Sequence, residues 1–128
     1  LHTLHERKPL RVERSLRTMS TLLTTPGMTT VVLERDGKVV AYACCGKGAD
    51  LHGHWHELGG SDEDLAVLLP AAMHTVAQVE AALLLPPYRP RLRALLAPHT
   101  IGESMIPGPM VRAGGAVPPF FIDGLDSV

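Results

Sequence analysis

The chain has 128 residues, 45% hydrophobic and 20% charged, which suits one globular domain with one hydrophobic core and argues against disorder. The net charge of −1 leaves no basic excess to neutralise phosphates, so nucleic acid is not an expected partner. No apolar run reaches the roughly 18 residues that would indicate a membrane-spanning helix, so no membrane partner is expected.

The two cysteines, Cys44 and Cys45, are adjacent in an apparent strand. Neighbouring strand residues point to opposite faces, so we expect two reduced thiols rather than a disulfide. This pattern and the lack of a visible signal peptide favour a cytoplasmic protein. The chain begins with Leu1 instead of methionine, and we therefore expect it to be part of a longer protein.

The N-terminal region, residues 5–23, has the apolar spacing of a helix and ends at the turn residues 24–27. Its basic residues recur at roughly helical spacing, which predicts a solvated face rather than a ligand patch. These residues are Arg7, Lys8, Arg11, Arg14 and Arg17.

Three strands are predicted next. The β-branched run 28–34 and the run 38–45 flank Asp36-Gly37, a strong hairpin turn signal because Gly adopts positive φ without cost. A loop at 46–50 leads to a third strand over 51–58, which Gly59-Gly60 should end.

A helix is predicted after those glycines. Ser61 can cap it and Asp64 stands at the capping-box position. Acidic residues in the first turn suit the positive end of the helix. Pro70 lies inside the apolar pattern that follows, and it should kink the helix or break it into two.

The rest of the chain predicts further alternation. The apolar run 79–85 indicates a buried strand. A short helix is predicted over 88–97 and a loop over 98–109. A short strand at 110–113 and a last strand at 117–122 complete the order. The whole chain, 1–128, is thus predicted to be one α/β domain of the α+β type, with a mixed sheet and helices packed on it.

The order and three local sequences resemble GNAT-family N-acetyltransferases. "VVLERDGKVVAYACCGKGADLHGHWHELGG" is similar to the central strands, and "EAALLLPPYRPRLRALL" to the fifth strand and following helix. "MVRAGGAVPPFFIDGLDSV" resembles the C-terminal strand of one half of a two-domain member. The resemblance implies a mostly antiparallel sheet with helices on both faces, and transfer of an acetyl group from acetyl-CoA to an amine.

The resemblance also implies roles for particular residues. Glu57 would be the general base that deprotonates the amine, with His56 as the fallback because its pKa lies near neutrality. Tyr88 would protonate the departing thiolate. The segment Leu58, Gly59, Gly60 and Ser61 would hold the cofactor.

A non-enzymatic alternative rests on one departure from the family pattern. The usual Q/R-x-x-G-x-G/A pyrophosphate motif is replaced by "GGSDEDLAVLL". Asp62, Glu63 and Asp64 would repel a pyrophosphate at this helix end. The domain would then be a degenerate half that acts in packing, dimerisation or substrate shaping, against another GNAT domain of the same chain or a homodimer partner.

Each candidate residue also has a structural interpretation. Glu57 would bond a neighbouring loop, and Tyr88 beside Pro87 would serve packing. His52, His54 and His56 would share one face of a strand, where an ordinary exposed or groove-facing strand is favoured over a metal-binding module. No metal site is predicted.

Overall fold

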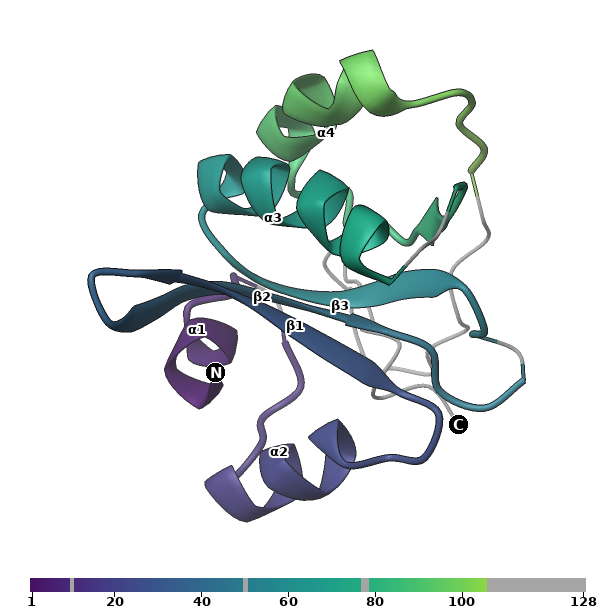
Figure 1. Cartoon of the computed structure of the whole chain (residues 1–128). Coiled ribbons are helices and arrows are strands. Elements are labelled where there is room, and N and C mark those ends of the chain that lie inside the picture. The colour runs from purple at the N-terminus through teal and green to yellow at the C-terminus, as the bar shows by residue number, and fades with distance from the viewer. Residues whose placement is uncertain (10, 50, 77–78, 106–128) are drawn as a thin grey trace, which may run out of the picture.

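The protein is a mixed α/β domain whose sheet has helices on both faces (Figure 1). The computed structural model describes residues 1–9, 11–49, 51–76 and 79–105. Its four-stranded sheet has the order β1-β2-β3-β4, antiparallel except for the parallel β3–β4 pair. The strands span Thr29–Arg35 (β1), Lys38–Cys45 (β2), His54–Gly60 (β3) and Ala82–Leu83 (β4). The helices span His2–Glu6 (α1), Leu16–Leu23 (α2), Asp62–Thr75 (α3), Pro90–Leu96 (α4) and Ala97–His99 (3₁₀ helix η1).

The predicted hairpin is confirmed. Asp36 and Gly37 both have positive φ, 51° and 70°, as a tight turn matching the strand twist requires. The helices lie in two layers: α1 and α2 cover one face of the sheet, and α3 and α4 cover the other (Figure 1). Each layer has its own buried cluster, one around Trp55, Leu65 and Leu92 and a smaller one of Met19, Tyr42 and Cys44.

The prediction of one helix over 5–23 was wrong, because the structure forms two short helices, and the described residues 11–14 between them are not helical. Pro9 lacks the backbone N–H that would continue α1, and Ser15 caps the new start by accepting a hydrogen bond from the Thr18 N–H. The prediction that the basic residues of this region form a solvated face was wrong in part. Lys8 and Arg14 are only 3% and 7% exposed.

The third strand begins and ends later than predicted, and Gly59 and Gly60 lie within it. Its pairing with β2 is irregular: Cys44 pairs with Glu57 but Cys45 pairs with Trp55. This bulge breaks the two-residue alternation. As a result, Trp55 joins the cluster under α3 and α4, while Glu57 bonds Tyr42 on the other face. Regular two-residue alternation would place Trp55 and Glu57 on one face, and the bulge puts them on opposite faces instead.

Two further predictions needed correction. Of the two outcomes predicted for Pro70, a kink or a break, the break does not occur: α3 runs unbroken for 14 residues with Leu65, Leu68, Leu69 and Ala72 buried. This packing outweighs the one hydrogen bond that proline removes. The strand predicted over 79–85 is reduced to the two residues of β4. The strands predicted at 110–113 and 117–122 lie outside the described residues.

Candidate functional site

Glu57 is the centre of a buried polar cluster between the sheet and the α1 segment. Its side chain is fully buried, and its Oε1 accepts hydrogen bonds from Lys8 Nζ and, at 2.8 Å, from the Tyr42 hydroxyl. Arg14 donates to Oε2 at 3.2 Å. The His5 Nδ1 lies 3.5 Å from Oε1 and 3.4 Å from an Arg14 nitrogen. The Glu57 carboxylate thus contacts side chains from α1, from the segment between α1 and α2, and from β2.

This surrounding sets the ionisation of Glu57. Burial by itself would raise the pKa of the carboxyl group. The hydrogen bond with His5 and the charges of Lys8 and Arg14 outweigh burial and hold the pKa of Glu57 well below its usual range. The carboxylate is therefore ionised at neutral pH, and in this conformation its low basicity makes it a weak proton acceptor.

Sequence reasoning found Glu57 but missed its partners. Lys8 and Arg14 stand 49 and 43 residues away in the chain, and Tyr42 lies on the adjacent strand. The helix assigned across 5–23 placed both basic side chains in solvent. Pro9, directly after Lys8, was the available signal that the first helix ends there.

A groove of about 640 Å³ lies beside this cluster. It runs between α1, the start of β2 and the β3–α3 turn, and it reaches Gly60 and Ser61, two of the residues predicted to hold a cofactor. Leu58 is buried in the larger core cluster, and neither it nor Gly59 lines the groove. Four basic side chains and one acidic side chain line it: Arg7, Lys8, Lys38 and Arg89, with Asp64.

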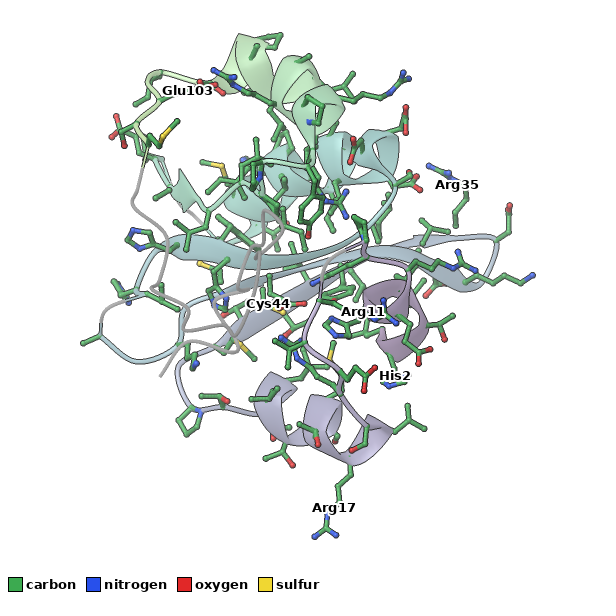
Figure 2. All side chains as sticks on the ribbon, turned by 180° about the vertical axis from the view of Figure 1, so that it is seen from behind. His2, Arg11, Arg17, Arg35, Cys44 and Glu103 are labelled. Carbon is green, nitrogen blue, oxygen red and sulfur yellow. The ribbon has the colours of Figure 1, made fainter. Side chains whose placement is uncertain are left out.

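The three acidic residues at the start of α3 are each paired with an arginine. Asp62 contacts Arg89 at 2.6 Å, Glu63 contacts Arg91 at 2.5 Å, and Asp64 contacts Arg35 at 2.8 Å. The arginines come from β1, from α4 and from the residue before α4; Figure 2 shows Arg35 close to the α3 layer. The sequence alone showed the acids without these partners, so it overstated the negative charge at this turn.

The backbone at the same turn is tightly packed. Ser61 caps α3 as predicted, with its Oγ accepting from the Asp64 N–H at 3.1 Å. A Cβ on Gly59 would lie 2.1 Å from the Tyr42 ring. Gly60 has φ of +128°, and a Cβ there would lie 2.7 Å from the Val40 carbonyl oxygen. Packing alone therefore accounts for both glycines.

His56 and Tyr88 lie apart from the groove lining. His56 is buried at the bulge, where its Nε2 bonds the Gly46 carbonyl oxygen, and burial lowers the pKa of its ring. Tyr88 lies in the turn before α4, half-buried, instead of in the helix. The structure thus brings Glu57, Gly60 and Ser61 to one region and leaves His56 and Tyr88 outside the groove.

The remaining candidate residues, the histidines before and in β3 and the two cysteines, have positions that structural roles explain. His52 lies in a turn ahead of β3, so the three histidines do not share one strand, and His54 bonds the His52 carbonyl oxygen. Among the described residues, no group of three or more His, Cys, Asp or Glu side chains is placed to hold a metal ion. Cys44 and Cys45 form no disulfide and lie in opposite core clusters, as predicted, and burial raises the pKa of Cys44 to about 12.

The fold and site define a mixed α/β domain with a buried carboxylate next to a basic groove. Scans against protein-family models, curated proteins and solved structures each found no significant match. In the described part of the chain, no helix has the length and apolar character needed to cross a membrane.

Proposed function

We propose that this chain is a GNAT-like domain that binds acetyl-CoA and transfers its acetyl group to an amine. The observation that carries the proposal is the groove that joins the β3–α3 turn to the neighbourhood of Glu57. The order of an antiparallel hairpin, a third strand, a helix and a parallel strand agrees with the resemblance in the sequence.

The charges of the groove support an anionic ligand. Arg7 and Lys38 line it together with Lys8 and Arg89, which pair with Glu57 and Asp62. The acids that were expected to repel a pyrophosphate each face an arginine. The positive charges of the groove attract a negatively charged phosphate group, and the positive end of α3 adds to the attraction. In this proposal Gly60 and Ser61 lie beside the pyrophosphate.

The roles of the other predicted residues are proposals of the same kind. Glu57 would accept the proton of the amine once its basic neighbours are displaced, because only then does its pKa rise toward a useful range. Tyr88 would act as the acid only after a movement that brings it to the groove. Acetyl-CoA is proposed as the co-substrate.

A second candidate is the non-catalytic packing module. Two observations favour it: the ion pairs of Glu57, and the use of the Asp64 N–H of α3 within the turn itself. Such a domain would need no accessible base, and an exposed apolar side chain such as Leu16 on α2 would lie against another GNAT domain or a second copy.

Calorimetric titration with acetyl-CoA separates the two candidates. Micromolar binding is expected, and Lys38→Glu should weaken it about tenfold, because it reverses a charge in the groove. Arg17→Glu makes the same charge change on α2, where Figure 2 shows the side chain pointing away from the sheet, and should leave binding unchanged. No heat up to millimolar acetyl-CoA would support the packing module instead.

A further inference from the structure

The Lys8 amino group occupies an unusual position. Its Nζ donates to Oε1 of Glu57, and the two side chains are 1% and 0% exposed. Lys8 also lines the groove that reaches Gly60 and Ser61. A primary ammonium group therefore lies between the buried carboxylate and the basic groove.

Local structure holds Lys8 there. The helix α1 ends at Glu6, and the Lys8 N–H bonds the His5 carbonyl oxygen at 3.1 Å. Arg11 donates to the Lys8 carbonyl oxygen at 3.2 Å. The ammonium group lies 5.9 Å from the centre of the Tyr42 ring, a favourable cation–π distance.

Stability alone does not call for this lysine. Arg14 already places a positive charge on Oε2, and Tyr42 donates to the same oxygen that Lys8 contacts. Buried ion pairs contribute little net stability over well-packed apolar side chains, since both charges lose their hydration. Stability therefore does not explain why Lys8 adds a second buried cation beside Glu57. A role of this position in binding a cationic ligand explains it better.

We infer that Glu57 and the Tyr42 ring form a binding site for a primary ammonium ion, and that Lys8 fills this site from within the chain. The inference deepens the proposed function, on which its catalytic meaning rests: Lys8 stands where an acceptor amine would approach Glu57. An external amine then binds only when the Lys8 side chain leaves, so Lys8, just after α1, keeps the site closed.

The test replaces Lys8 and supplies the missing ammonium from solution. Lys8→Ala removes the side chain but leaves Glu57, Tyr42 and Arg14 in place. Addition of about 10 mM butylammonium chloride should raise the thermal midpoint of this variant by about 3 °C, through binding to the folded state. The same salt should not shift the unmodified protein or Lys38→Ala, which alters the groove away from Glu57.

Tetramethylammonium chloride is the matched probe, because it carries the same charge but has no N–H to donate to the carboxylate. Equal shifts with both salts, or no shift in a folded Lys8→Ala variant, would overturn the inference. If Lys8→Ala does not fold, Lys8→Met keeps the apolar stem and is tested with ammonium chloride. Failure of both variants to fold would show that Lys8 is indispensable to the fold and would also overturn it.

The readout above needs no acetyl-CoA, so it is independent of the proposed function. With acetyl-CoA and butylamine present, Lys8→Ala should transfer acetyl groups at least about tenfold faster than the unmodified protein, because the acceptor position is open and Lys8 no longer lowers the pKa of Glu57. In this step the amine nitrogen forms the amide bond, its proton passes to Glu57, and the thioester C–S bond breaks to release coenzyme A as the thiol. Amine binding without transfer would leave the ammonium site standing and count against the acetyltransferase proposal alone.

Discussion

At the scale of single residues, Glu57 joins parts of the chain that are distant in sequence. Its carboxylate contacts Lys8 and Arg14, and all three side chains are 1% exposed or less. Glu57→Gln would leave two buried cations without their counter-charge. We expect a loss of about 3–5 kcal/mol in the free energy of unfolding, measured by urea denaturation at pH 7.

The effect of this variant should depend on pH. The pKa of Glu57 is depressed in the folded state, so its stabilisation is present above the unfolded value, about 4.3, and is lost as pH falls toward the folded value. The difference between the unmodified protein and Glu57→Gln should therefore shrink below about pH 4. A constant difference from pH 7 to pH 3 would show that the ion pairs do not set the stability of the folded state.

At the scale of elements, α3 shows how local signals and packing combine. Ser61 satisfies an N–H of the first turn, while Leu65, Leu68 and Leu69 bury one side of the helix. Ser61→Ala should lower the free energy of unfolding by about 1 kcal/mol, because the Asp64 N–H loses its acceptor. Ser104→Ala, at an exposed position, is the control and should change stability by less than about 0.5 kcal/mol. Equal effects would mean that the cap contributes nothing.

At the scale of the whole molecule, the two helical layers share β2 and β3. Trp55, the single tryptophan, lies in the cluster under α3 and α4, while Met19, Tyr42 and Cys44 form the cluster under α1 and α2. Because both clusters use the same strands, we expect one cooperative transition. Tryptophan fluorescence and far-ultraviolet circular dichroism should give the same midpoint in urea. An earlier transition in circular dichroism alone would mean that α1 and α2 unfold as a separate unit.

The sequence by itself determined the features that depend on neighbouring residues. The Asp36-Gly37 hairpin, the Ser61 cap and the opposite directions of Cys44 and Cys45 follow from turn, capping and strand geometry within a few residues. The mixed fold class followed from the order of such elements. Glu57 was singled out, although its partners were not.

Only the tertiary structure decided which charges meet. Lys8 and Arg14 reach Glu57 across 49 and 43 residues, and the bulge in β3 turns Glu57 to the face opposite Trp55. No local propensity encodes an ion pair between distant segments, because its energy depends on burial and distance in the folded chain. The same reason explains why the acids of α3, which looked uncompensated in sequence, are paired with arginines in the fold.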